Sequence, residues 1–146
     1  MSASVTVIVP TFNERDNVAE LVSRTAAALA GREAEILFVD DSSDDTMAEI
    51  ARVSASAPVP IRGIHREHNT AGLGGAVVVG LAEAAHDVCV VMDGDLQHPP
   101  ELLPTMIARY ERGMPMSSPP PATSAAEIRR AWGRPCAWAC RRPRPQ

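Results

Sequence analysis

The sequence predicts an α/β fold in which a parallel sheet is flanked by helices, and two observations support this prediction. Between residues 4 and 112, short β-branched runs alternate four times with segments of helical spacing, and the connections are short. This alternation is typical of a parallel sheet covered by helices. The polar clusters of the chain directly follow the strand-like runs, at the carboxyl edge where such sheets bind ligands. We therefore expect one α/β domain at residues 4–112.

The first half of this region contains two strand-helix units. Residues 4–9 form a β-branched run that predicts a buried strand, and the segment from Pro10 ends it. Apolar residues then recur at helical spacing between Val18 and Leu29. A second strand is expected at residues 35–39. It leads into an acidic turn and a short helix over about residues 46–56.

The second half repeats the pattern. A third strand is expected at residues 61–65 and is followed by a polar loop, a glycine-rich segment and a helix that reaches about Ala85. The fourth run, residues 87–92, is the most apolar of the four predicted strands. A last helix is expected over about residues 101–111. Each unit therefore places a polar loop at the same edge of the sheet.

Composition restricts the class of protein. The chain has 146 residues, 45% of them hydrophobic and 22% charged, which suits one globular domain. It contains no apolar run of about 20 residues and no signal-peptide pattern. Its three cysteines form no CxxC motif, as is usual in a reduced compartment. We expect a cytoplasmic protein.

Residues 113–146 differ in composition from the rest. They are rich in proline and arginine and contain a single acidic residue, Glu127. Proline is excluded from sheet interiors and helix interiors, so we expect an irregular tail. Its arginines follow no pattern typical of nucleic-acid binding, and we expect no nucleic-acid partner.

A pair of acids follows the fourth predicted strand. Asp93 and Asp95 are two residues apart, so both carboxylates can face one ligand. Close carboxylates repel unless a cation lies between them, and oxygen ligands favour Mg²⁺ or Mn²⁺. Gly94 leaves room for a ligand beside the backbone, and Gln97 offers a further oxygen. The competing interpretation is a solvated acidic turn.

Two other enzyme classes fit these residues poorly. The glycines of residues 72–75 precede a predicted helix, as in dinucleotide-binding proteins, but Val77 occupies the place of the third glycine. That motif should also follow the first strand. A phosphatase with an aspartyl nucleophile would require different residues after Asp95 than Leu96 and Gln97.

Four segments together resemble the family 2 glycosyltransferases of the GT-A fold, and among them the polyprenol-phosphate (dolichol-phosphate) mannosyltransferases. They are residues 7–14 (VIVPTFNE), 38–46 (FVDDSSDDT), 72–76 (GLGGA) and 91–101 (VMDGDLQHPPE). The resemblance extends over residues 4–112. It implies that this region is the nucleotide-binding half of a GT-A domain.

The resemblance also assigns roles to individual residues. The residues expected to bind the nucleotide are Pro10, Phe12, Glu14, Val39, Asp41, Asp93 and Gly94. The residues expected to hold Mg²⁺ or Mn²⁺ are Asp93, Asp95 and Gln97, and the two aspartates form the catalytic pair. Phe12 stands where the family often has tyrosine.

The activity implied is a metal-dependent, inverting transfer of mannose from GDP-mannose to a polyprenyl phosphate at the membrane surface. A phosphate acceptor is already ionised near neutral pH, so it needs no general base, and residues 4–112 offer no convincing one. The alternatives are a family 2 transferase that uses UDP-glucose and an inactive fragment that binds only nucleotide and metal. The family continues beyond the last predicted helix, so we expect this chain to be truncated, or shifted in reading frame, after about residue 112.

Overall fold

The computed structural model describes residues 2–113 and 138–141. The elements, in chain order, are β1 (Val5–Thr11), α1 (Arg15–Ala28), β2 (Ala34–Asp40), α2 (Thr46–Ser54), β3 (Ile61–His65), α3 (Gly72–Glu83), β4 (Val88–Val91), the 3-10 helix η1 (Pro100–Leu102), α4 (Leu103–Glu111) and β5 (Trp138–Arg141).

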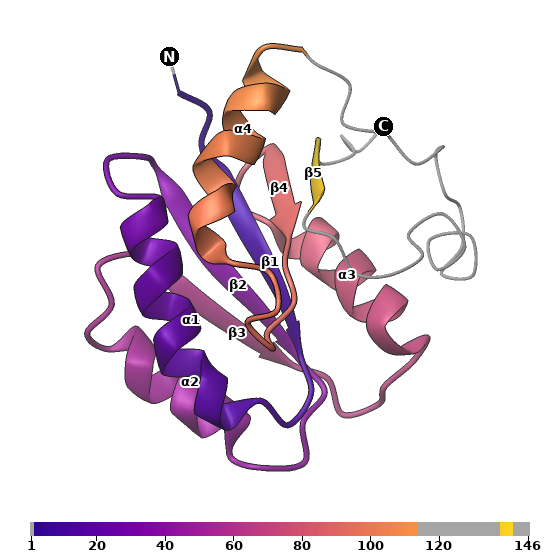
Figure 1. Ribbon diagram of the computed structural model, residues 1–146. Coiled ribbons are helices and arrows are strands. Elements are labelled where there is room, and N and C mark those ends of the chain that lie inside the picture. Colours follow the sequence, from indigo (N-terminus) through magenta and orange to yellow (C-terminus); the bar gives the residue numbers. More distant parts are fainter. Residues whose placement is uncertain (1, 114–137, 142–146) are drawn as a thin grey trace.

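The strands form one sheet in the order β3-β2-β1-β4-β5. The first four are parallel, as the sequence predicts, with Val5 of β1 paired to Ala34 of β2 and to Val88 of β4. Helices α1, α2 and α4 cover one face of the sheet, and α3 covers the other (Figure 1). The carboxyl ends of all four parallel strands therefore lie at one edge.

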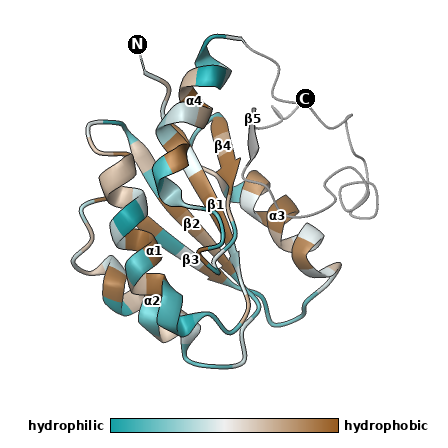
Figure 2. Cartoon of the chain, in the orientation of Figure 1, coloured by the Kyte–Doolittle hydropathy of each residue, from teal (hydrophilic) through white to brown (hydrophobic). Residues whose placement is uncertain are grey.

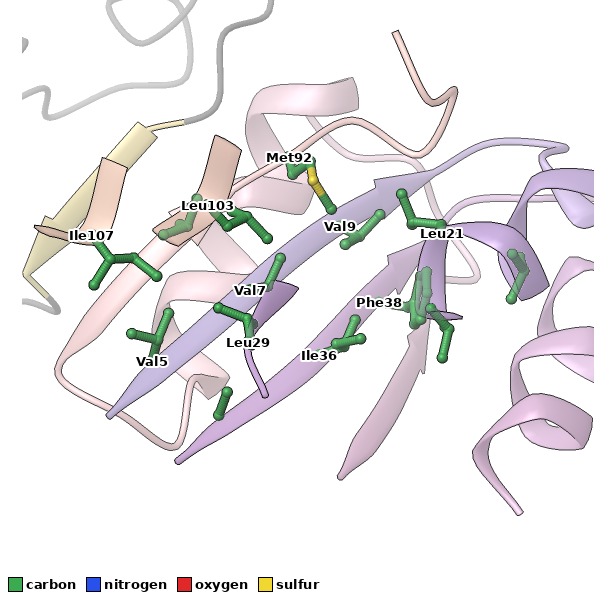
Figure 3. Close-up of a cluster of buried hydrophobic side chains, with 14 of the residues drawn as sticks. Val5, Val7, Val9, Leu21, Leu29, Ile36, Phe38, Met92, Leu103 and Ile107 are labelled. Atoms are coloured by element: carbon green, nitrogen blue, oxygen red, sulfur yellow. The ribbon is translucent and has the colours of Figure 1, made fainter. Parts of the chain in front are cut away.

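Alternate residues of the central strands build two separate cores. On the face of α1, α2 and α4, Val7, Phe38 and Val90 join one cluster with residues from those helices, and Figure 3 shows part of it. On the face of α3, Ile8 and Leu37 belong to a smaller cluster. The strands are apolar in Figure 2, whereas polar residues mark the outer sides of α1 and α2. Burial on both faces explains why most residues of these strands are apolar.

The expected elements agree with the structure apart from their ends. The third strand has its predicted bounds. β1 continues through Pro10 to Thr11, two residues further than expected, because it pairs with β2 as far as Asp40. The last helix divides into η1 and α4, with proline near the start of both. Proline is tolerated there because the first turn of a helix lacks intrahelical partners for its N–H groups.

One strand lies where the sequence predicts irregular structure. Residues 138–141 form β5, which pairs antiparallel with β4, Val88 opposite Arg141 and Val91 opposite Trp138. These four residues contain no proline, and β5 is an edge strand, where neighbouring prolines are tolerated. The prediction of an irregular tail is therefore wrong for residues 138–141. The rest of the tail from residue 114 lies outside the described residues.

Within residues 2–113 and 138–141, no helix has the length and hydropathy required to span a membrane.

Candidate functional site

A cavity of about 360 Å³ opens at the carboxyl edge of the sheet. It lies between the loops that follow β1, β2, β3 and β4 and the first turns of α3. The residues that line it are Pro10, Thr11, Phe12, Glu14, Asp41, Asn69, Leu73, Ala76, Asp93, Gly94 and Asp95.

A larger hollow of about 800 Å³ lies at the opposite end of the strands. It is formed by the segments before β2 and β3, residues 29–34 and 56–60, together with one side of α1. Most of its lining side chains are small and apolar, and its charged residues are Arg32 and Glu33. Arg32 already donates hydrogen bonds to Glu111 and to the carbonyl of Ala3. The chemistry-bearing side chains therefore gather at the carboxyl edge and not in this hollow.

The buried carboxylate of Asp40 ties the loops after β1 and β2 together. Its oxygen Oδ1 accepts hydrogen bonds from Thr11 Oγ1 (2.7 Å) and from Ser42 Oγ (2.5 Å). Ser42 Oγ in turn accepts a bond from the backbone N–H of Asn13 at 2.8 Å. The other carboxylate oxygen, Oδ2, lies 2.9 Å from His65 Nδ1. This network fixes the loop that carries Phe12 and Glu14 relative to the end of β2.

Arg66 fixes Asp41 and the loop before α3. Its guanidinium forms a two-pronged ion pair with Asp41, in which Nε donates to Oδ1 at 2.6 Å. It also donates to the carbonyls of Thr70 (3.0 Å) and Gly72 (2.9 Å). A Cβ atom at Gly75 would lie 2.1 Å from the Thr70 carbonyl oxygen, so only glycine fits this close approach. The first turn of α3 therefore packs closely against the loop that precedes it.

Glu14 packs directly over Gly94. A Cβ atom at Gly94 would lie 2.0 Å from Glu14 Oε2, which is buried and has no hydrogen-bond partner. Burial, followed by the charges of Asp95, Asp93 and Asp40, raises the pKa of Glu14 to about 7. The cavity therefore holds a concentration of negative charge that a cation would relieve.

Asp93 and Asp95 occupy the turn after β4. Burial, and then the charge of Asp95, raises the pKa of Asp93, whereas nearby His98 lowers it. His98 Nδ1 is buried without a hydrogen-bond partner and lies 3.9 Å from Asp93 Oδ2. Asp95 Oδ1 accepts a hydrogen bond from the backbone N–H of Gln97 at 3.1 Å. The position of His98 beside Asp93 depends on the path of this turn, so nothing in the sequence indicates it.

The structure brings most of the expected site residues to one cavity. Those that line it are Pro10, Phe12, Glu14, Asp41, Asp93, Gly94 and Asp95. Val39 does not line it, because its side chain is fully buried in the core on the face of α3. Gln97 is exposed and also lies outside the lining.

Four residues that line the cavity are not among the expected site residues: Thr11, Asn69, Leu73 and Ala76. Asn69 belongs to the polar loop after β3, and its place at the carboxyl edge is a signal that could have identified it. Leu73 belongs to the GLGGA segment of the family resemblance, but a leucine in a helical pattern is normally a core residue, so its role is not expected.

The donor set fits a hard divalent cation that is shared with a ligand. Asp93 and Asp95 supply carboxylate oxygens, which Mg²⁺ and Mn²⁺ prefer. Among the described residues, no group of three or more His, Cys, Asp or Glu side chains is arranged to hold a metal. Mg²⁺ is commonly bound by one or two carboxylates together with substrate phosphates. The site therefore suits an ion completed by phosphate oxygens, and not a metal enclosed by protein alone.

The chain is similar to known sugar transferases. The model of the family "Glycosyl transferase family 2" matches residues 6–140. Dolichol-phosphate mannosyltransferase of Pyrococcus furiosus is 48% identical over 109 residues, which are 75% of this chain and 30% of that protein. Undecaprenyl-phosphate 4-deoxy-4-formamido-L-arabinose transferase of an Enterobacter species is 35% identical over 117 residues. That match covers 75% of this chain and 34% of the relative.

Solved structures show the same fold. The mannosyltransferase PcManGT of Pyrobaculum calidifontis, in complex with GDP-Man and Mn²⁺, superposes with a TM-score of 0.59 at 25% identity. The match covers 65% of this chain and 28% of that one. S. aureus TarS in complex with UDP gives a TM-score of 0.62 at 26% identity, over 75% of this chain and 32% of that one.

The chain spans about a third of the length of these curated relatives. The family match nevertheless includes every strand of the sheet, apart from single residues at the ends of β1 and β5, and the whole cavity. The parallel, helix-flanked sheet of this chain agrees with the fold of the solved structures. The chain therefore belongs to glycosyl transferase family 2.

Proposed function

We propose that this chain binds a nucleotide sugar for a metal-dependent, inverting transfer of mannose from GDP-mannose to a polyprenyl phosphate. The observation that carries the proposal is the single cavity that contains Phe12, Asp41, Asp93 and Asp95. An aromatic ring and an acidic edge suit a nucleobase, and the acid pair suits a cation bound to a diphosphate. The named relatives support the lipid phosphate as acceptor.

Asp93 and Asp95 would hold the Mg²⁺ or Mn²⁺ ion. When bound, the ion neutralises the negative charge that the departing nucleoside diphosphate gains as the glycosidic bond breaks. The two aspartates keep that positive charge at the diphosphate end of the donor. Glu14 lies against the backbone of Gly94 and adds a further acidic group beside this pair.

A lipid phosphate removes the need for a general base. The second pKa of a phosphate is about 6, so its oxygen is ionised near neutral pH and can attack directly. The acceptor would meet the site at a membrane surface, which suits a peripheral protein.

A second donor class has support from one comparison. TarS, which has the same fold, is described in complex with UDP. A UDP-sugar, such as UDP-glucose, is therefore the alternative donor for this chain. The other alternative is a chain that binds nucleotide and metal but transfers no sugar.

Calorimetry and a transfer assay separate these cases. The full chain is titrated with GDP and with UDP in the presence and absence of Mn²⁺. We expect Mn²⁺-dependent binding with a preference for GDP, and a preference for UDP would favour the alternative donor. Transfer of labelled mannose from GDP-mannose to a polyprenyl phosphate then tests the reaction, and binding without transfer would indicate the inactive alternative. Absence of Mn²⁺-dependent nucleotide binding would contradict the proposal.

A further inference from the structure

Two of the most exposed hydrophobic side chains lie at the candidate site. Among the described residues, the large hydrophobic side chains that are exposed are Phe12, Leu73, Val78 and Leu102. Phe12 is 60% exposed and Leu73 is 55% exposed, and both line the 360 Å³ cavity. Single exposed hydrophobic residues are ordinary, but two that come from distant segments and line one cavity beside a pair of acids suggest a ligand.

Both side chains are held by ordered backbone. The segment of Phe12 is anchored by the bond from the backbone N–H of Asp41 to the carbonyl of Thr11 at 3.0 Å. Leu73 lies in the first turn of α3, and Arg66 fixes the preceding loop by donating to the carbonyls at positions 70 and 72. The same guanidinium holds Asp41, so one residue fixes both the leucine and the acidic edge of the cavity. A site held in this way is preorganised for its ligand.

The remaining lining defines the chemistry of that ligand. Asp41 and Asn69 offer hydrogen-bonding groups near the apolar pair, and Asp93 and Asp95 offer oxygens for a cation. A matching ligand combines a flat apolar ring that has polar edges with an anionic group that binds metal. A nucleoside diphosphate has both parts.

We propose that Leu73 is a specificity-determining residue that packs, together with Phe12, against the base of the donor nucleotide. This inference rests on the proposed function and goes beyond it, because it assigns recognition of the base to a residue of the glycine-rich segment. Leu73 gains burial only when a base is present, so it should contribute to binding of the nucleoside and not of the diphosphate.

The test compares two ligands and three variants by calorimetry on the full chain with Mn²⁺. The ligands are GDP and pyrophosphate, which lacks the base. The variants are Leu73→Ala, the conservative Leu73→Met, and Leu102→Ala as the matched control. Leu102 is 52% exposed on η1 and lies outside the cavity. Far-ultraviolet circular dichroism, which reports the helix content, verifies the fold of each variant.

We expect Leu73→Ala to weaken GDP binding about tenfold, since burial of a leucine side chain contributes roughly this factor or more. Pyrophosphate binding should not change, Leu73→Met should keep most of the GDP affinity, and Leu102→Ala should match the unmodified chain.

Three results would overturn the inference. If Leu73→Ala binds GDP normally, the leucine does not contact the base. If GDP and pyrophosphate weaken equally, Leu73 only shapes the loop. Either result leaves the proposed function intact. If the unmodified chain binds no nucleotide with Mn²⁺, both the proposed function and this inference are wrong.

Discussion

At the scale of single residues, the candidate site is a set of acids whose charges are only partly compensated. Asp41 has an arginine partner, whereas Glu14 and Asp93 are half-buried beside Asp95 and their pKa values are raised. Unrelieved repulsion of this kind disfavours the folded state unless protons or a cation offset it. We therefore explain this cluster of acids by the binding of a ligand and not by a contribution to the stability of the fold.

Removal of one acid should separate binding from folding. We predict that Asp95→Ala abolishes Mn²⁺-dependent GDP binding, because the cation loses one of its two carboxylates. Asp95 is exposed, so the free energy of unfolding should change by no more than about 0.5 kcal/mol. Calorimetry and urea denaturation measure the two quantities. Asp87→Ala, an exposed acid before β4, is the control and should bind normally. Unchanged GDP binding in Asp95→Ala would show that the acid pair is a solvated turn and not a metal site.

Glu14 should make stability depend on pH. Its pKa is raised from 4.5 to about 7, so the folded chain favours the protonated form. The stability gained from this proton is fully present below pH 4.5 and is lost as the pH rises towards 7. We predict that Glu14→Gln, which stays neutral, is more stable than the unmodified chain at pH 8 by about 1–2 kcal/mol after allowance for solvent screening. Urea denaturation without metal at pH 5 and pH 8 measures this, and an equal difference at both values would contradict it.

At the scale of elements, close packing of α3 on β1 positions the site loop. A Cβ atom at Gly80 would lie 2.4 Å from Cγ2 of Ile8, a residue with no exposed surface. Glycine costs a helix roughly 1 kcal/mol relative to alanine, so the close approach must outweigh helix propensity at this position. The first turn of the same helix carries Leu73. A displacement of α3 would therefore also move Leu73 and change the shape of the cavity.

Whether Gly80→Ala raises or lowers the free energy of unfolding tests this contact. We predict that Gly80→Ala lowers the free energy of unfolding by about 1–2 kcal/mol, because overpacking against Ile8 exceeds the gain in helix propensity. Gly63→Ala is the control, since the nearest atom there is the flexible end of the Met47 side chain. The double variant Gly80→Ala, Ile8→Ala lacks Cγ2 of Ile8, so its loss of stability should be smaller than the sum of the losses in the two single variants. Urea denaturation of the unmodified chain, Gly80→Ala, Ile8→Ala and the double variant measures the coupling. A more stable Gly80→Ala chain would show that the helix moves freely.

At the scale of the whole molecule, β5 changes the boundary of the sheet. Without it, β4 would present unpaired N–H and C=O groups at an open edge, which favours association with other chains. Antiparallel pairing with residues 138–141 covers that edge. Residues 114–137, which are 24 in number, separate this strand from the described residues before it. Residues 138–141 therefore belong to the sheet.

Shortening the chain tests the role of β5. We predict that a chain ending at residue 137 loses hydrogen-exchange protection in β4, residues 88–91, because the edge pairing of that strand is lost. β2, which pairs with β1 and β3, should keep its protection and serves as the internal control. Exchange followed by mass spectrometry measures both strands, and light scattering follows association. Unchanged protection of β4 would contradict the prediction.

The fold class and the acids of the site follow from the sequence alone. The strand run of residues 88–91 is apolar throughout, and that of residues 5–9 is apolar except for Thr6, because both faces of these strands are buried. This pattern is visible without coordinates. Short connections that contain helices then require parallel pairing, which brings all carboxyl ends to one edge. Asp41, Asp93 and Asp95 come directly after strands, so their positions in the sequence predict that they share this edge of the sheet.

Only the tertiary structure decided the features that depend on distant contacts. Leu73 looks like a core residue in the sequence, and its exposure at the cavity results from the path that Arg66 imposes on its loop. The burial of Glu14 depends on Gly94, which lies 80 positions away in the chain. β5 forms because β4 offers a free edge, which no property of residues 138–141 reveals. These contacts join segments far apart in the chain, and local propensity and periodicity carry no information about them.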